Sequence, residues 1–265
     1  MTEARRGSDH PDMQDEIGRL IARAAEAIAA ARHLVAFTGA GISVESGIPP
    51  FRGAGGLWES YDPSILDIDT FRAAPETAWK AIKALFYDHW GSCAPNAAHR
   101  VLADWEARGL LAATITQNID GLHGEAGSRA VAEYHGSLKD LACTRCGARK
   151  SAKDTDLNDL PPRCASCGGI LKPDFVFFGE GIPAEAGSAA AAAVGACDCL
   201  LVIGTSGEVY PAAALPGVAK SRGAVVIELN PKPSAYTARI VDLFLPLGAS
   251  AGMERLDAAL SAPAV

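Results

Sequence analysis

The sequence lacks an excess of positive charge. Its 265 residues carry a formal net charge of −7, and only 6% of them are aromatic. Proteins that bind nucleic acids through the phosphates need a basic face, so this balance argues against general nucleic-acid binding and leaves a basic peptide open as a partner. No apolar run approaches the length of a membrane span. Residues 1–13 lack the apolar stretch of a secretory signal, so we expect a disordered tail there and a cytoplasmic protein.

Four of the seven cysteines form two Cys-x-x-Cys pairs, separated by seventeen residues. A two-residue spacer lets one tight turn present two sulfurs to one ion, and the separation falls in the zinc-ribbon range. A chance grouping or disulfides are the alternatives, but thiols in a reducing compartment bind metal ions more often than they form disulfides. Four thiolates leave no open coordination position, so we predict one structural zinc ion. Its predicted ligands are Cys143, Cys146, Cys164 and Cys167.

Apolar strands alternate with helices along most of the chain. The strands are short and wholly apolar, as in buried parallel sheets, and each ends in small or polar residues. Strands alternating with helices require crossover connections, so we predict an α/β fold with a Rossmann-like parallel sheet and helices on both faces. We expect strands at 34–37, 112–116, 199–203 and 224–229, and helices at 15–32, 184–194 and 212–220.

Two stretches interrupt this alternation. Residues 47–93 show helical patches and no clear strand, and residues 136–172 carry the cysteine pairs. We expect both to be insertions that together form a smaller domain, made of a helical insert and a zinc ribbon. The large domain then comprises 14–46, 94–135 and 173–255, with a second tail at 256–265.

A glycine-containing turn, Gly-Ala-Gly-Ile-Ser, follows the first predicted strand directly. Glycines let a backbone approach a pyrophosphate closely, and free N–H groups can cradle it. The turn is not the usual G-x-G-x-x-G, because position 44 is Val and the next glycine is Gly47. A plain tight turn is therefore an alternative. Arg52 adds a cation that could pair with a phosphate.

Several segments in register over about residues 15–250 resemble the sirtuins of the bacterial or archaeal type. They are GAGIS, GIPPFRG, TQNIDGLH, the Tyr134–His135–Gly136 step, the two cysteine pairs, KPDFVFFGE and GTS. Sirtuins are NAD-dependent protein-lysine deacylases. The resemblance implies that NAD is consumed as a co-substrate, and that the products are nicotinamide, O-acyl-ADP-ribose and free lysine.

The resemblance also assigns roles to individual residues. His135 matches the general base that acts on a ribose hydroxyl, a task that suits imidazole because its ordinary pKa lies near the working pH. Asn118 is the second expected catalytic residue, positioning a ribose or a water, and Asp120 would bind the nicotinamide carboxamide; an Asx turn is the alternative for this segment. The family usually has Leu at position 134. The other expected cofactor contacts are Gly39, Ala40, Gly41, Ser43, Ser46, Phe51, Arg52, Gln117, Gly204, Thr205, Ser206 and Asn230, with a plain turn as the alternative for the last.

Two segments match those that flank the family's peptide substrate, residues 176–180 and 207–210. An extended peptide can add between them as a strand, although both are also plausible core strands. Glu180 and Glu208 would favour basic residues beside the acyl-lysine. The expected peptide contacts are Val176, Phe178, Gly179, Glu180 and Val209.

The acyl pocket is predicted to be neutral. Sirtuins that prefer succinyl or malonyl groups carry a Tyr-x-x-Arg pair in the helix after the cofactor loop, where the arginine pairs with the acyl carboxylate. Alignment on Trp79 puts Ile82 and Leu85 at the pair, and alignment on Tyr87 puts Trp90 at the arginine. Neither alignment supplies an arginine, so we expect acetyl or a longer apolar acyl group.

Three other functions compete with deacylation. The same fold could transfer ADP-ribose to a protein. A non-catalytic NAD-sensing zinc protein could bind nucleic acid through the basic residues around the cysteines. A dehydrogenase is a third possibility, but it would need the usual fingerprint and an acidic ribose ligand. We expect a monomer that binds acyl-lysine peptides, and neither nucleic acid nor membrane.

Overall fold

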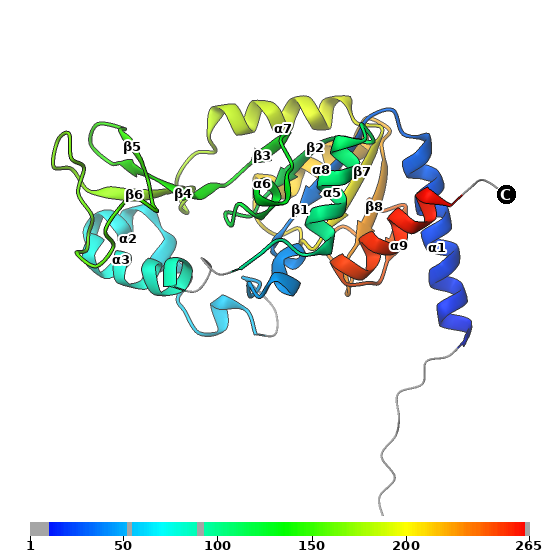
Figure 1. Cartoon of the computed structure of the whole chain (residues 1–265), viewed down its shortest axis with the longest axis horizontal. Helices are drawn as coiled ribbons and strands as arrows, with labels where there is room; N and C mark the ends of the chain where they lie inside the picture. The colour runs from blue at the N-terminus through cyan, green and yellow to red at the C-terminus, as the bar shows by residue number, and fades with distance from the viewer. Residues whose placement is uncertain (1–10, 52–54, 89–92, 263–265) are drawn as a thin grey trace, which may run out of the picture.

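The computed structural model describes residues 11–51, 55–88 and 93–262. Six parallel strands form its main sheet, in the order β3–β2–β1–β7–β8–β9, and Figure 1 labels all of them except β9. The four strands expected from the sequence are confirmed. The short edge strands β3 and β9 are additional, because three residues are too few to show a periodicity. The strands are β1 (Leu34–Thr38), β2 (Leu111–Thr116), β3 (Val131–Glu133), β7 (Cys199–Ile203), β8 (Val225–Leu229) and β9 (Leu243–Leu245).

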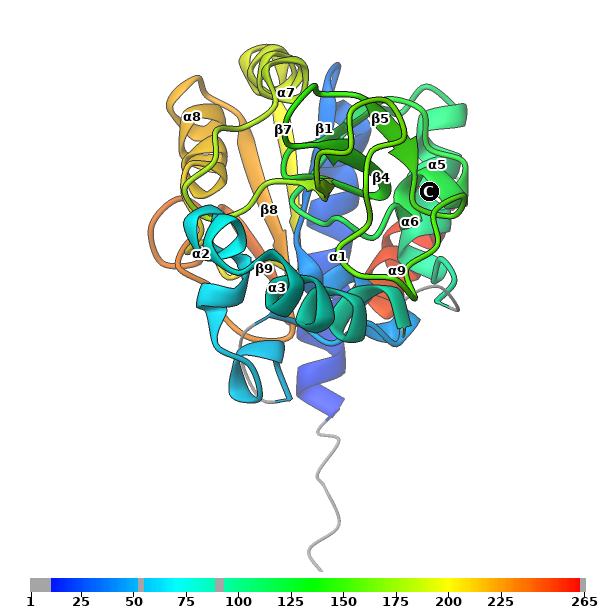
Figure 2. The same cartoon turned by 90° about the vertical axis from the view of Figure 1, so that its left-hand side faces the viewer.

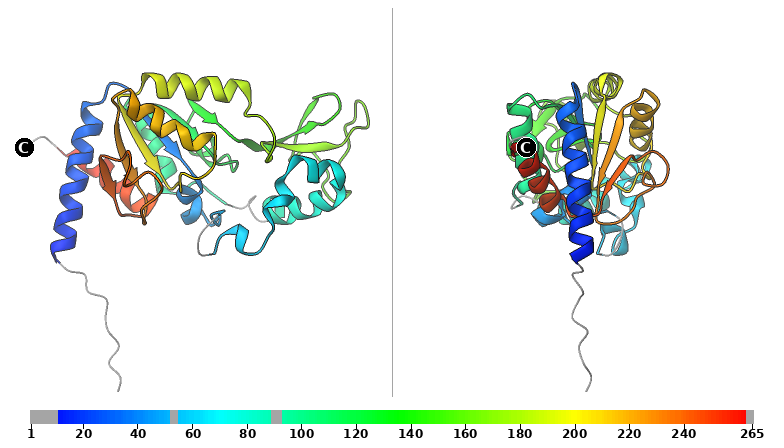
Figure 3. Two further views of the ribbon diagram at one scale, coloured as in Figure 1. Left: turned by 180° about the vertical axis from the view of Figure 1, so that it is seen from behind. Right: turned by 90° about the vertical axis from the view of Figure 1, so that its right-hand side faces the viewer.

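Helices cover both faces of this sheet, as Figures 2 and 3 show. On one face α1 (Pro11–Ala30), α5 (Ala97–Ala107) and α9 (Ala249–Ser261) bury an apolar cluster. On the other, α7 (Ala184–Ala196) and α8 (Leu215–Ser221), which the 3₁₀ turn η5 (Ala212–Ala214) precedes, bury a second cluster. The first helix begins at Pro11, before its expected start. We call this sheet with α1 and α5–α9 the sheet module, where α6 is Leu122–Ala126.

The two insertions lie side by side at the other end of the molecule (Figure 1). A three-stranded antiparallel sheet, β5–β4–β6, packs there against short helices around a third apolar cluster. The buried indole of Trp79 donates a hydrogen bond to the carbonyl of Leu171 at 2.8 Å and so ties the two insertions together. We call this the ribbon module. Its elements are η2 (Leu57–Glu59), η3 (Pro63–Leu66), α2 (Ile68–Ala73), α3 (Pro75–Ile82), the π-helical η4 (Lys83–Tyr87), β4 (Gly136–Cys143), β5 (Arg149–Ser151) and β6 (Leu171–Phe175).

A single asparagine connects helix α5 to the turn that follows β1. Asn96 caps α5 by accepting a hydrogen bond from the N–H of Ala98 at 3.0 Å. Its amide donates to the carbonyl of Ile42 at 2.7 Å and to the hydroxyl of Ser46 at 3.0 Å. The turn, a 3₁₀ helix η1 (Ala40–Ser46), is therefore fixed from the sheet-module side. Within the described ranges, no helix is both long enough and apolar enough to span a bilayer.

Candidate active site

A cleft of about 620 Å³ separates the two modules at the carboxyl ends of the parallel strands. Ligands of open α/β sheets bind at this edge. The residues predicted from the sequence that line it are Gly39, Ala40, Gly41, Phe51, Gln117, Asn118, His135, Val176, Phe178, Gly179, Glu180, Gly204, Thr205, Ser206, Val209 and Asn230.

Three of the predicted cofactor residues that the structure describes do not line the cleft. Ser43 and Asp120 lie immediately behind it, bonded to each other. Ser46 is held by Asn96 instead. Arg52 lies outside the described residues, so its predicted phosphate contact has no structural counterpart here.

The glycines after β1 allow two backbones to touch. The N–H of Gly41 donates to the carbonyl of Gly204 at 2.8 Å. A Cβ on Gly41 would lie 2.6 Å from the Cα of Gly204, and Gly204 has a φ of +61°, which favours glycine. The sequence suggests room for a pyrophosphate as the reason for these glycines, and the structure adds the contact between the loops after β1 and β7.

His135 lies between β3 and β4, on the boundary of the two modules. Its Nδ1 is 3.0 Å from the carbonyl of Gln117, which can only accept, so Nδ1 carries the proton and Nε2 is the basic nitrogen. Burial lowers the pKa of His135, while the bond to Gln117 opposes the shift. The imidazole is therefore neutral at neutral pH. Tyr134, where the family usually has Leu, is buried with its ring 5.7 Å from that of His135.

A chain of hydrogen bonds fixes the residues beneath the cleft. The amide of Asn118 donates to the hydroxyl of Ser43 at 3.1 Å, and that hydroxyl donates to Asp120 at 2.8 Å. Asp120 also accepts from the N–H of Leu122 at 2.9 Å, which is the Asx turn considered as the alternative for this segment. Burial raises the pKa of Asp120, and these two hydrogen bonds oppose the shift. Asn118 is thus held in one orientation while still lining the cleft.

Two buried histidines lie behind this chain and were not expected from the sequence. The rings of His99 and His123 are 4.9 Å apart. His123 Nε2 is 2.9 Å from the hydroxyl of Thr38, and His99 Nε2 is 3.5 Å from that of Ser43. Burial lowers the pKa of His99 to about 4 and that of His123 to about 3, so both are neutral. The sequence does contain one indication that His99 is held in place, because it lies three residues after the capping Asn96, which is the spacing of a capping box.

The loop after β7 is tied to its neighbours on both sides. The amide of Gln117 donates to the hydroxyl of Thr205 at 3.0 Å. The amide of Asn230 donates to the carbonyl of Thr205 at 3.1 Å. Asn230 is therefore more than a turn residue before Pro231, because its side chain joins the loops after β7 and β8.

The predicted peptide segment is not a strand, because β6 ends at Phe175. Its backbone instead makes a bridge to the helical insertion, where Phe178 donates to Leu66 at 2.8 Å and accepts from Ile68 at 3.0 Å. Glu180 is paired with Lys172 at 3.0 Å. Its charge is thus balanced within the protein, so the expectation that Glu180 favours basic substrate residues is not supported. The exposed rings of Phe178 and Tyr210 also border the cleft.

One part of the cleft is apolar. Phe51, Trp58, Leu66 and Ile119 line it, and in the described part of the lining the only lysine or arginine is Lys232. The indole nitrogen of Trp58 is buried and has no hydrogen-bond partner among the described residues. The two positions aligned with the acidic-acyl pair, 82 and 85, are buried in the apolar cluster of the ribbon module, and Trp90 lies outside the described residues.

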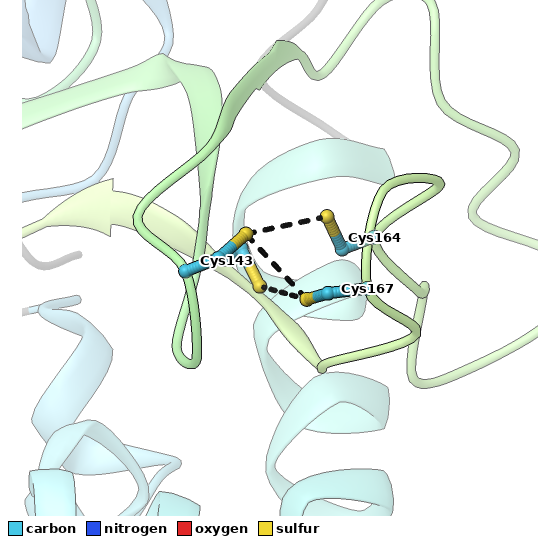
Figure 4. Close-up of side chains that lie close together, drawn as sticks. Cys143, Cys164 and Cys167 are labelled. Atoms are coloured by element: carbon cyan, nitrogen blue, oxygen red, sulfur yellow. Dashed lines mark hydrogen bonds between the residues drawn. The ribbon is translucent and has the colours of Figure 1, made fainter.

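The four predicted zinc ligands come together in the ribbon module (Figure 4). Their sulfurs all lie within 4.8 Å of one another, and three pairs are separated by 3.5, 3.5 and 3.8 Å. Thiolates around a tetrahedral zinc are about 3.8 Å apart, whereas disulfide sulfurs are about 2.05 Å apart. A Cβ at Gly169 would lie 2.9 Å from the sulfur of Cys143, so the glycine keeps this space open. The residues therefore fit one zinc ion.

The fold and the cleft define the class of Rossmann-like nucleotide-binding proteins with a zinc-ribbon insertion. The Sir2 family model matches residues 39–211, and the chain belongs to that family. An NAD-dependent protein deacylase 2 of Pyrobaculum aerophilum is 46% identical over 236 residues, which cover 88% of this chain and 92% of that protein.

Solved structures agree in fold. A mutant Sir2 homologue in complex with ADP-ribose superimposes with a TM-score of 0.86 at 39% identity, covering 90% of this chain and 95% of the other. A Sir2 structure with p53 peptide and NAD⁺ has a TM-score of 0.80 at 34% identity, covering 87% and 94%.

Proposed function

We propose that this protein is an NAD-dependent protein-lysine deacylase that removes neutral acyl groups and yields nicotinamide, O-acyl-ADP-ribose and free lysine. The name of the Pyrobaculum relative and the peptide and NAD⁺ in the Sir2 structure support this activity. The observation that carries it is His135, a neutral imidazole with its Nδ1 fixed by Gln117, in a cleft bordered by both modules.

NAD would bind along the loops after β1, β2, β7 and β8. The bound cofactor supplies a ribose carbon that becomes electrophilic as nicotinamide leaves. Asn118 and Asp120 would orient the nicotinamide ribose and carboxamide, because both are pre-oriented through Ser43. Thr205, Ser206 and Asn230 would hold the adenosine end. The remaining proposed contacts are Gly39, Ala40, Gly41, Ser46, Phe51, Arg52, Gln117 and Gly204.

His135 would act as the general base. Its Nε2 accepts a proton from a ribose hydroxyl, since Nδ1 is already committed to Gln117. The lowered pKa keeps this nitrogen unprotonated at neutral pH. Cys143, Cys146, Cys164 and Cys167 would hold a structural zinc, because four thiolates leave no position open for substrate.

The substrate peptide would add as a strand beside residues 176–180. The carbonyl of Val176 and the N–H of Gly179 have no partner among the described residues and are free for main-chain hydrogen bonds. Phe178, Glu180 and Val209 would flank the acyl-lysine. Main-chain recognition explains tolerance of different peptide sequences.

A panel of acyl-lysine peptides with NAD tests this function. Wild-type protein should release acetyl or longer apolar groups faster than succinyl from one matched peptide. The variant His135→Ala should lose about 10²–10⁴-fold in kcat while still binding NAD, and the exposed His33→Ala should behave as wild type.

The same reaction mixtures distinguish the alternatives by mass spectrometry. ADP-ribose attached to protein, without O-acyl-ADP-ribose, would contradict deacylation and favour ADP-ribosyl transfer. Faster removal of succinyl than acetyl would contradict the neutral pocket.

We further propose a cytoplasmic monomer in which 14–46, 94–135 and 173–255 form the NAD-binding domain. The insertions 47–93 and 136–172 form the small domain. The tail expected at 256–265 is instead the end of α9, which runs to Ser261 and buries Leu256, and the tail expected at 1–13 overlaps α1, which begins at Pro11. The separate apolar clusters of the two modules support this division. Salt-sensitive DNA binding at physiological ionic strength would contradict the expected absence of a nucleic-acid partner.

A further inference from the structure

Lys172 is a buried lysine in β6, four positions before the peptide segment 176–180. Its side chain is only 10% exposed. The ammonium donates to the carbonyls of Pro173 at 2.9 Å and Phe175 at 2.7 Å, and it pairs with Glu180 at 3.0 Å. These contacts use all three of its hydrogens. It also lies 4.1 Å from the ring centroid of Phe177, within the range of a cation–π contact.

The partner carboxylate continues the connection. Glu180 accepts a hydrogen bond from the N–H of Phe177 at 2.9 Å through the same oxygen that pairs with Lys172. The ammonium therefore holds the carbonyl of Phe175, and the carboxylate holds the N–H of Phe177. These two backbone groups lie on either side of Val176, so the pair restrains both peptide units that flank this residue.

Val176 is also connected to the general base of the proposed reaction. Its N–H donates to the backbone carbonyl of His135 at 2.8 Å. A change in the backbone at Val176 would thus reach His135 directly. The carbonyl of Val176, which has no partner in the described part of the chain, is restrained as well, because it belongs to the peptide unit whose N–H is bonded to Glu180.

Stability alone is a weak reason for this arrangement. Moving two charges out of water is unfavourable, and apolar residues of similar volume often stabilise a fold as well or better. Two aromatic residues, Phe175 and Phe177, already pack into the ribbon core beside the lysine. Apolar side chains in these positions could not form the directional hydrogen bonds that hold the carbonyl of Phe175 and the N–H of Phe177.

We propose that Lys172 is a positioning residue whose ammonium, together with Glu180, fixes the backbone of residues 175–177 in the conformation that receives the acyl-lysine peptide. This inference rests on the proposed function. Lys172 contacts no reacting atom and acts through the segment that it holds.

The test replaces Lys172 with Met, which keeps an unbranched apolar stem and removes the charge. We expect the KM for acetyl-lysine peptide to rise by roughly tenfold or more, as for loss of hydrogen bonds to a charged group, while the KM for NAD stays within about twofold. Hydrogen exchange of residues 173–180 should become faster, with the parallel sheet unchanged. Lys172→Arg should recover part of the loss, because it restores the charge.

Arg149→Met is the matched control. Arg149 is a cation of the same module, paired with Asp174 at 3.0 Å, but its side chain is 68% exposed. We expect it to change neither KM. If it raised the peptide KM as much as Lys172→Met, the loss would reflect the charge of the module and the proposal would be overturned. Equal rises in both KM values for Lys172→Met would also overturn it.

Glu180→Gln breaks the same restraint from the other side and keeps the proposal testable if Lys172→Met does not fold. Where both single variants fold, the double variant gives a further test. The two single losses should not add, because each breaks the same restraint. Full additivity would overturn the proposal. If the wild type showed no deacylation at all, the proposed function would fail by itself. The hydrogen-exchange comparison would still decide whether Lys172 restrains residues 175–177, and unchanged exchange would refute it.

Discussion

The two sides of the cleft are made rigid by different means. In the sheet module all five residues of β1 are buried, and every inner strand lies between two apolar layers. In the ribbon module β4 has exposed residues, and the helical insertion is built from short helices and 3₁₀ turns. Besides its own apolar cluster, the ribbon module is held together by four thiols, a buried ion pair and one indole hydrogen bond. Apolar burial is distributed over many residues, whereas such local ties can be removed one at a time.

The strongest test of this difference removes one zinc ligand. Cys143→Ser should abolish zinc binding and unfold the ribbon module, because metal binding and folding are coupled in small metal domains. The sheet module should stay folded, so far-UV circular dichroism should retain most of its helical signal while deacylation is lost. The control Cys93→Ser changes a cysteine outside the cluster and should retain its zinc. The measurement is the amount of zinc that is released when a reagent modifies the thiols. A fully active Cys143→Ser protein would refute the division of roles.

Acid should act on the sheet module through its buried histidines. The pKa values of about 4 for His99 and about 3 for His123 lie below the ordinary 6.5, so the unfolded chain takes up protons first as the pH falls. Stability is therefore complete above pH 6.5 and declines below it by about 1.4 kcal/mol per pH unit for each histidine, down to about pH 4 for His99 and about pH 3 for His123. Urea unfolding at several pH values measures the slope. His123→Asn should remove its share, and an unchanged slope would contradict this explanation.

The contact between the glycine loops offers a smaller test on the same side. Gly41→Ala should cost about 1–3 kcal/mol of unfolding free energy, because its Cβ would press on Gly204 at 2.6 Å. NAD affinity, measured by calorimetry, should fall because the two loops move apart. Gly18→Ala is the control: its Cβ meets nothing within 4 Å, so it should stabilise α1 by up to about 1 kcal/mol. Unaltered NAD affinity in Gly41→Ala would show that the loops tolerate separation.

A matched pair of tryptophans gives the smallest expected difference. Trp79→Phe leaves the carbonyl of Leu171 in the ribbon core without its donor and should cost about 1–3 kcal/mol. Trp105→Phe in the sheet module should cost about 1 kcal/mol, because its acceptor Asp257 is partly exposed and keeps Arg108 at 2.7 Å. Chemical denaturation compares them. Equal costs would mean that the ribbon module depends no more on single polar ties than the sheet module does.

The sequence predicts those parts of the molecule that repeat a pattern. β1, β7 and β8 are recognisable because strands buried on both faces are wholly apolar, and the zinc ligands because a metal imposes fixed spacing. The strand ends then place Gln117, Asn118 and Thr205 at one cleft.

What the sequence does not reveal depends on burial that arises only in three dimensions. Lysine is usually a surface residue, and nothing in the sequence around Lys172 indicates that Glu180 lies beside it. His99 and His123 meet from different helices, although the capping pattern at Asn96 hints at the first. The role of the glycines likewise depends on a partner loop more than a hundred residues away, which no local pattern encodes.

The central position of β1 has a consequence for how the chain is made. Leu34 pairs with Leu111 on one side and with Cys199 on the other, so the core of the sheet closes only after β7 has left the ribosome. All four cysteines of the zinc cluster have been synthesised by then. Such long sequence separations between partners slow folding and leave apolar strands exposed during synthesis. Because zinc binding and folding are coupled, zinc bound during translation would let the ribbon fold before β7 is complete, and without zinc both insertions would stay open to proteases.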